Sequence, residues 1–316
     1  MRTHHIQIGS LCRRLASLLL VIAVAAWGMQ VAQSAEGRGR RADFRDINIV
    51  RDLVYKRVDG HNLQLDIYSP KSISHPLPVA LWIHGHRWSY GSKEQHPSVN
   101  LLAHGYIVVS LDYRLSGEAP FPAAIEDCKA AVRWLRANAT TYHIDPDHIG
   151  AWGHSAGGHL AALLGTSGGV AELEGAGDNS TFSSRVQAVC DMSGPSDILQ
   201  FYETVSSLNN GPGRRAKVAV EQFLGGSVEQ NRAKAIAASP ITYVSKDDAA
   251  FLLIHGENDM SIPVSQSEVF VDKLKAAGVD ATLEIARGRG HGVGAPNYAS
   301  EIIGFFDKYL KPSGSP

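Results

Sequence analysis

The sequence predicts an α/β fold, with a mostly parallel central sheet and helices on both of its faces. Short apolar runs recur along the 316 residues, and amphipathic segments with a helical period lie between them. Strands that alternate with helices in this way are typical of parallel sheets. Because most of the apolar runs are continuous, we expect most of the strands to be buried on both faces.

Eight runs are expected to form the strands. A turn signal at Asp59-Gly60 joins the first two runs as a hairpin. In the second run, the alternation of Leu63, Leu65 and Ile67 indicates a half-exposed strand near the edge of the sheet. The expected strands are residues 53–58, 63–68, 79–83, 106–111, 149–152, 186–192, 251–254 and 282–285.

Helices are expected at residues 122–138, 263–277 and 298–310, where apolar residues recur on one face or proline and glycine mark the ends. Residues 200–239 are less regular, although the stretch 216–224 has a helical pattern. This segment lies between two core strands. It is either a cap that shapes a substrate site or an ordinary crossover helix with a long loop.

The N-terminus has the pattern of an export signal. Three arginines precede an apolar run at residues 15–27, and Ala32-Gln33-Ser34, just before Ala35, resembles a small-residue cleavage site. We therefore expect residues 1–34 to be a signal peptide, residues 35–52 a mobile lead-in and residues 53–311 the folded domain. The protein would be exported, to the periplasm or beyond, without stable membrane association after cleavage. An uncleaved membrane anchor is the alternative.

Composition limits the classes of partner. The net charge of −1 argues against a nucleic-acid partner or an anionic membrane surface. Of the three cysteines, Cys12 lies in the leader, and Cys128 and Cys190 are expected to be buried free thiols. No cysteine or histidine spacing typical of a metal site accompanies them, so neither a metal nor another cofactor is expected. The sequence does not fix the oligomeric state.

One short stretch combines the features of an activated nucleophile: Gly153-His154-Ser155-Ala156-Gly157. It follows an apolar strand and precedes a helix of small residues. The G-x-S-x-G pattern is that of a nucleophile elbow, a sharp turn on which the serine projects above the sheet. The two glycines leave room where the strand and the helix cross. The amide of Ala156, at the start of the helix, can donate to an oxyanion.

An acid and a base follow in the chain order Ser155, Asp259, His291. Asp259 comes just after the strand at residues 251–254, so it belongs at the carboxyl edge of the sheet, where catalytic groups gather. Glu257 is its nearest rival. His291 lies in a glycine-rich loop after the last strand, from which an imidazole can reach between serine and aspartate. The alternatives are a structural turn aspartate and an ordinary loop histidine.

Several blocks together carry a family resemblance. The segment His84-Gly85-His86-Arg87-Trp88 resembles the H-G-G-G-W loop of esterases related to hormone-sensitive lipase. It is especially similar to the bacterial branch that includes the feruloyl esterase-like (BD-FAE-type) enzymes. The resemblance extends from about Val54 to Leu310. Its further blocks are residues 112–115, 120–122, 153–158, 239–241 and 255–259.

The resemblance implies an α/β-hydrolase fold and a serine carboxylesterase that works through an acyl-enzyme, without a cofactor. It implies an oxyanion hole formed by amides of Gly85, His86, Arg87 and Ala156. His86 and Arg87 depart from the family pattern, which has glycines at both positions. Their side chains either point away over the surface or enter and reshape the site, and Arg87 then offers a charged contact to an acidic or sugar-like substrate.

The expected substrate is a small-molecule or polysaccharide ester, with acetyl or feruloyl groups on plant polysaccharides as the leading class. Trp88, Tyr90 and His154 are the expected substrate-binding residues. A general small-ester or lipid esterase is the nearest alternative. An amide or peptide hydrolase would need the same three catalytic residues, and a non-catalytic binding protein is the remaining alternative.

Overall fold

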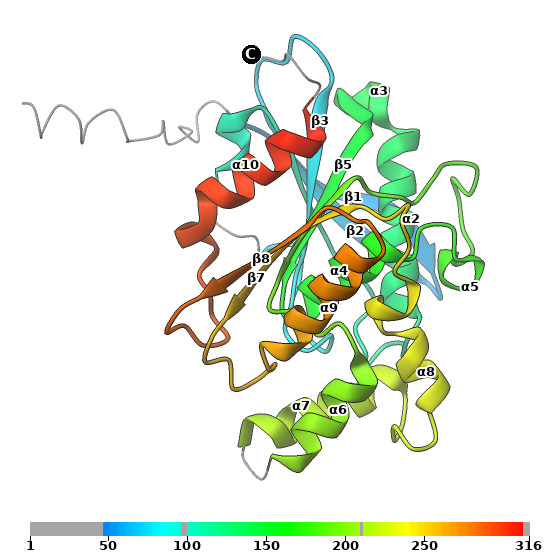
Figure 1. Ribbon diagram of the computed structural model, residues 1–316. Coiled ribbons are helices and arrows are strands. Elements are labelled where there is room, and N and C mark those ends of the chain that lie inside the picture. Colours follow the sequence, from blue (N-terminus) through cyan, green and yellow to red (C-terminus); the bar gives the residue numbers. More distant parts are fainter. Residues whose placement is uncertain (1–46, 96–99, 209–210, 312–316) are drawn as a thin grey trace, which may run out of the picture. The chain divides into compact units, whose positions relative to one another are not determined.

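The computed structural model describes residues 47–311, except for 96–99 and 209–210 (Figure 1). Eight strands form one sheet in the order β1-β2-β4-β3-β5-β6-β7-β8. Strand β2 is antiparallel to both of its neighbours, and the strands from β4 through β8 are mutually parallel. The strands are β1 (Ile47–Val58), β2 (His61–Pro70), β3 (Leu77–Ile83), β4 (Ile107–Leu111), β5 (Ile144–His154), β6 (Ala188–Met192), β7 (Ala250–Gly256) and β8 (Ala281–Ala286).

All eight predicted strands are present, but the start of the domain was predicted too late. The prediction of a mobile lead-in is wrong for residues 47–52, which form the first half of β1. The register of β1 shifts between Val50 and Leu53, and Asp52 has a φ of 58°. Such a bulge interrupts the period of two by which a strand is recognised in a sequence. The predicted signal peptide and residues 35–46 lie outside the described residues.

Alternate side chains of the central strands enter two separate cores, one on each face of the sheet. In β3, Leu81 and Ile83 belong to the larger core and Trp82 to the smaller one. The larger core includes residues of α2, α4 and α9, and the smaller core includes residues of α10. Burial on both faces explains why these strands read as continuous apolar runs.

Helices are present at all three predicted positions, residues 122–138, 263–277 and 298–310, and they contribute side chains to these two cores. Figure 1 shows α10 on one side of the sheet and α2 and α4 on the other. The helices are α2 (Ala123–Ala137), α3 (Ala139–Tyr142), α4 (Ala156–Thr166), α5 (Ala171–Glu174), α9 (Ser265–Ala276) and α10 (Ala299–Leu310), with short 3-10 turns at Leu101–His104, Pro240–Tyr243 and Ala295–Tyr298.

Cys128 and Cys190 are both buried free thiols, as predicted. Cys128 belongs to the larger core and Cys190 to the smaller one, so the sheet lies between them. Among the described residues, no helix is long and apolar enough to cross a membrane.

Much of the described part of the segment at residues 200–239 is helical. It forms most of α6 (Ile198–Ser207), α7 (Gly211–Leu224) and α8 (Arg232–Ala237), between β6 and β7 in the chain. Helix α6 packs against both α7 and α8. Figure 1 shows the three helices gathered at the lower end of the sheet. Buried Phe201, Val220 and Phe223 anchor this group to the larger core.

The crossing of α4 over the ends of β3 and β5 leaves no room for a side chain. A Cβ atom on Gly157 would lie 2.1 Å from the carbonyl oxygen of Ile83. A Cβ atom on Gly153 would lie 2.4 Å from the backbone of Gly157. Real Cβ atoms do not approach backbone atoms so closely, so glycine is required at both positions for reasons of space.

A pair of glycine-to-alanine variants tests this crossing. Gly157→Ala must push α4 away from β3, and we expect it to lower the free energy of unfolding by about 2 kcal/mol or more. Gly304, on the exposed side of α10, has no atom within 4 Å of its added Cβ. Gly304→Ala should therefore raise stability by about 0.5–1 kcal/mol. Urea unfolding measures both values, and similar effects of the two substitutions would contradict the steric account.

Candidate active site

Ser155 occupies a sharp turn between β5 and α4. Its φ of 59° and ψ of −122° are an unusual combination for a residue with a side chain, and such backbone strain is common at functional sites. The Ser155 amide donates to the carbonyl oxygen of Met192 at 2.8 Å, which fixes the turn against β6. Helix α4 begins at Ala156, so its positive end lies directly beside the serine.

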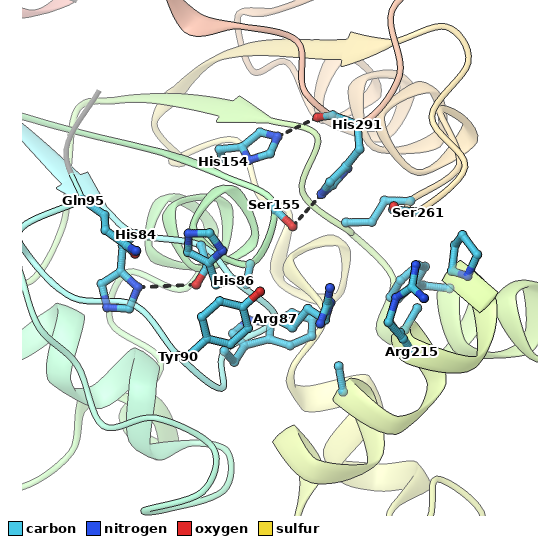
Figure 2. Close-up of a pocket in the computed structure, with 18 of the residues that line it drawn as sticks. His84, His86, Arg87, Tyr90, Gln95, His154, Ser155, Arg215, Ser261 and His291 are labelled. Atoms are coloured by element: carbon cyan, nitrogen blue, oxygen red, sulfur yellow. Dashed lines mark hydrogen bonds between the residues drawn. The ribbon is translucent and has the colours of Figure 1, made fainter. Parts of the chain in front are cut away.

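His291 connects Ser155 to Asp259. The imidazole Nε2 lies 2.9 Å from the Ser155 hydroxyl oxygen, and Nδ1 lies 2.7 Å from Oδ2 of Asp259. Figure 2 shows the imidazole reaching down from its loop to the serine. When Nδ1 carries the proton and donates it to the carboxylate, Nε2 is free to accept the serine proton. The structure thus brings together the three residues that the sequence analysis selected from segments far apart in the chain.

Asp259 is held as a carboxylate. Its Oδ1 accepts hydrogen bonds from the amides of Ser261 at 2.8 Å and Ile262 at 2.9 Å. Burial acts to raise the pKa of Asp259, but hydrogen bonds from His255 and His291 outweigh it and hold the pKa below its usual range. The carboxylate therefore stays ionised and orients the His291 ring.

No role was predicted for His255, although it lies in a block that carries the family resemblance. The side chain is fully buried at the end of β7. Its Nε2 lies 2.9 Å from the Ile262 carbonyl oxygen and 3.4 Å from Oδ2 of Asp259, and its Nδ1 lies 2.7 Å from the Ser267 hydroxyl. His255 thus ties the Asp259 turn to helix α9.

His154 holds the backbone of the histidine loop. Its Nε2 lies 2.7 Å from the carbonyl oxygen of His291, and the two rings are 4.8 Å apart. Burial lowers the pKa of His154 to about 4, so at neutral pH the ring is uncharged and donates through Nε2. His154 also lines the cavity above the serine, where the sequence analysis expected a substrate contact.

The loop after β3 lies against the serine turn. A Cβ atom on Gly85 would lie only 2.5 Å from the His154 carbonyl oxygen. The next three residues, His86, Arg87 and Trp88, all have left-handed backbone, with φ values of 68°, 58° and 60°. Glycines normally fill two of these positions in the family that the sequence resembles, and glycine adopts this conformation without strain.

Trp88 fixes the end of this strained loop. It is 3% exposed, and its ring stacks on Phe223 of α7 with centroids 4.4 Å apart. Its indole N–H donates to Nδ1 of His159 at 3.1 Å, while Nε2 of His159 lies 2.7 Å from the Ala238 carbonyl oxygen. Burial lowers the pKa of His159 to about 4, so the neutral ring can both accept and donate.

A cavity of about 300 Å³ opens above Ser155. The side chains of His86 and Arg87 are exposed at this cavity, and the His86 ring stacks on Tyr90 with centroids 4.7 Å apart. Of the two alternatives for these side chains, the structure therefore shows the one in which they border the site. Figure 2 shows Arg87 and Tyr90 facing the same space as the serine.

Every predicted site residue lines this cavity except Asp259, which lies behind His291. Other lining residues were given no site role by the sequence. Those of α6 and α7 belong to no motif and reach the site through the packing of these helices, whereas His84 belongs to the H-G-G-G-W-like loop and Trp82 to β3. The residues without a predicted site role are Trp82, His84, Gln95, Phe201, Pro212, Arg215, Ala216, Ala219, Ser261 and Ile262. Helices α6 and α7 thus supply part of the wall, as expected of a segment that shapes a substrate site.

The BD-FAE family model matches residues 65–274. Among curated proteins, the chain is similar to the probable carboxylic ester hydrolase LipM of Mycobacterium tuberculosis. The two are 32% identical over 237 residues, which cover 73% of this chain and 53% of LipM. The chain spans about half the length of the curated relatives it matches first.

Two solved structures are also similar. A truncated carbohydrate esterase from gut microbiota is 33% identical, with a TM-score of 0.73 over 83% of this chain and 95% of that one. A bifunctional GH43-CE protein of Bacteroides eggerthii is 36% identical, with a TM-score of 0.73 over 82% of this chain and 38% of that one. The predicted α/β-hydrolase fold is confirmed, and the chain belongs to the BD-FAE family.

Proposed function

We propose that this protein is a serine carboxylesterase in which Ser155 is the nucleophile, His291 the general base and acid, and Asp259 the group that orients His291. The observation that carries the proposal is the continuous hydrogen-bonded path from Asp259 through His291 to Ser155, which ends at the cavity. A serine hydroxyl is a weak nucleophile on its own, and an adjacent base held by a third group activates it.

In the first stage, the Ser155 oxygen attacks the ester carbonyl while Nε2 of His291 takes its proton. The tetrahedral intermediate then breaks its bond to the alcohol oxygen, which leaves with the proton from His291. Asp259 stabilises the imidazolium that forms in between. The product of this stage is an acyl group on Ser155 and a free alcohol.

In the second stage, water attacks the acyl-enzyme. His291 takes a proton from the water and later returns it to the Ser155 oxygen as the carboxylic acid leaves. Because His154 holds the His291 backbone through its carbonyl oxygen, the imidazole can keep its position in both stages. The two stages need neither a metal nor an organic cofactor.

We assign the oxyanion hole to the amides of Ala156 and of the loop from Gly85 to Arg87. The contact of Gly85 with the serine turn supports this assignment, because it brings the loop within reach of the reacting carbonyl. The amide of Ala156 at the start of α4 adds a donor at the positive end of the helix. Removing one such donor typically costs about 100- to 1,000-fold in rate.

Acyl esters of plant polysaccharides are the substrate class that we propose first. Support comes from the solved relative described as a carbohydrate esterase and from the bifunctional GH43-CE protein. The aromatic and polar lining of the cavity, with Tyr90, Trp88 and Gln95, suits a sugar ring or an aromatic acyl group. The esterases of M. tuberculosis support the alternative of a general small-ester or lipid esterase.

We also propose that the protein is exported, on the basis of the pattern at residues 1–34. The intact mass of the protein from the periplasm or medium of expressing bacteria tests this. Cleavage near residue 34 is expected, and full-length protein retained in the cytoplasm would contradict it.

Hydrolysis of a substrate panel tests the proposed function. The panel contains 4-nitrophenyl acetate, 4-nitrophenyl butyrate, acetylated xylan, methyl ferulate and the amide 4-nitroacetanilide. We expect ester hydrolysis that Ser155→Ala reduces by roughly a thousandfold or more, because the nucleophile is lost. Ser300→Ala, at an exposed position of α10 outside the cavity, is the matched control and should keep the activity.

Acetate or ferulate release from the two plant-derived substrates would support the polysaccharide assignment. Hydrolysis of the nitrophenyl esters alone would instead indicate a general small-ester esterase. Faster cleavage of the amide than of its matching ester would contradict the carboxylesterase assignment.

The strained loop gives a stability prediction. Each left-handed residue with a side chain costs about 1–2 kcal/mol relative to glycine. We therefore expect the double variant His86→Gly, Arg87→Gly to be more stable than the double variant His86→Ala, Arg87→Ala by about 2 kcal/mol. The alanine variant also lacks both side chains but keeps the backbone strain, so the comparison isolates the backbone. Urea unfolding at one pH measures the difference, and equal stability of the two would contradict the observed loop conformation.

A further inference from the structure

A second hollow of about 370 Å³ lies beside the cavity above Ser155. Arg87, Arg215 and Ala219 line both spaces, so the hollow continues into the proposed active site. Arg214 lines the outer space, together with Ser89, Gly211, Val218 and Gln222. Three arginines, one from the loop after β3 and two from α7, therefore line these two adjoining spaces.

None of these three arginines forms an ion pair with a carboxylate elsewhere in the part of the chain that the structure describes. Other arginines at the surface do, such as Arg232 with Glu203 at 3.7 Å. Neither Asp nor Glu is among the residues that line either space. Among the described residues, no ion pair and no acidic lining residue therefore neutralises the charge of these three arginines.

The two arginines of α7 extend from a well-anchored helix. Val220 and Phe223, further along the same helix, are buried in the larger core, and Phe223 stacks on Trp88 of the loop that carries Arg87. The backbones that carry the three arginines are thus coupled through one aromatic contact. Figure 2 shows Arg87 and Arg215 on either side of the space in front of Ser155.

We propose that Arg87, Arg214 and Arg215 bind a carboxylate group of the ester substrate. Guanidinium groups bind carboxylates through two parallel hydrogen bonds, and partial enclosure strengthens the attraction. The inference rests on the proposed esterase function and adds the substrate class: an ester whose acyl or alcohol part carries an anionic group. The substrate carboxylate then lies in the second hollow, between the loop after β3 and α7, and the reacting carbonyl lies in the cavity above Ser155.

Two matched pairs of esters test which part carries the charge. For the alcohol part, 4-acetoxybenzoic acid is compared with its methyl ester. For the acyl part, mono-4-nitrophenyl adipate is compared with its methyl ester. The measured quantity is the ratio of kcat/KM for the anionic ester to kcat/KM for its neutral partner. This ratio removes any general effect of a variant on folding or on the chemical step.

The test variant is the double substitution Arg214→Gln, Arg215→Gln, which keeps polar side chains at both exposed positions. We expect the ratio to fall about tenfold or more for at least one pair, because a charge-assisted contact is lost. Arg57→Gln is the matched control, since Arg57 is exposed on the edge strand β1 and lines neither space. Its ratios should equal those of the wild type.

Ionic strength provides an independent readout. In the wild type the ratio should fall as salt rises from about 0.01 M to about 1 M, because the Debye length shrinks from about 30 Å to about 3 Å. In the double variant the ratio should depend less on salt. A fall for one pair only identifies which part of the substrate carries the anion.

Ratios that are the same in the wild type and the double variant for both pairs would overturn the proposal while leaving the esterase function intact. Absence of Ser155-dependent hydrolysis of the neutral esters would instead overturn the esterase function, and the carboxylate site with it.

Discussion

The position of Ser155 depends on a close backbone contact between helix α4 and the ends of strands β3 and β5. Helix α4 lies so close to the ends of β3 and β5 that Gly153 and Gly157 have no space for a Cβ atom. This contact forces the turn between them and gives Ser155 its positive φ. It also places the start of α4 and the loop after β3 on either side of the serine, so one packing constraint sets both the proposed nucleophile and the proposed oxyanion donors.

The parallel sheet positions the remaining groups of the site. Strands β3, β5, β7 and β8 end at the same edge, so the segments that follow them meet there, although the first and the last of them are about 200 residues apart in the chain. His255 and two backbone amides hold the Asp259 turn in place. His154 holds the His291 loop through the His291 carbonyl oxygen. His255 and His154 thus hold His291 and the Asp259 carboxylate in register with the serine.

The sequence predicted those parts of the site that follow directly from a strand. Ser155, Asp259 and His291 were found because a buried strand has a recognisable pattern and the chain order restricts the partners. Arg215 and Phe201 were not, because their place depends on how α6 and α7 pack, and no local pattern records that packing. The start of β1 was missed for a related reason, since a bulge and charged residues hide its period. The side-chain positions of His86 and Arg87 needed the structure, because either direction was compatible with the motif.

The central claim is that Ser155 carries the acyl group during turnover. The most direct measurement is mass spectrometry of the Ser155 peptide after rapid acid quenching of the enzyme during hydrolysis of 4-nitrophenyl acetate. We expect an acetyl group on Ser155 that forms before the steady state, and no such group in Ser155→Ala. Rapid hydrolysis with an unmodified Ser155 peptide, or with the acetyl group on another residue, would contradict it.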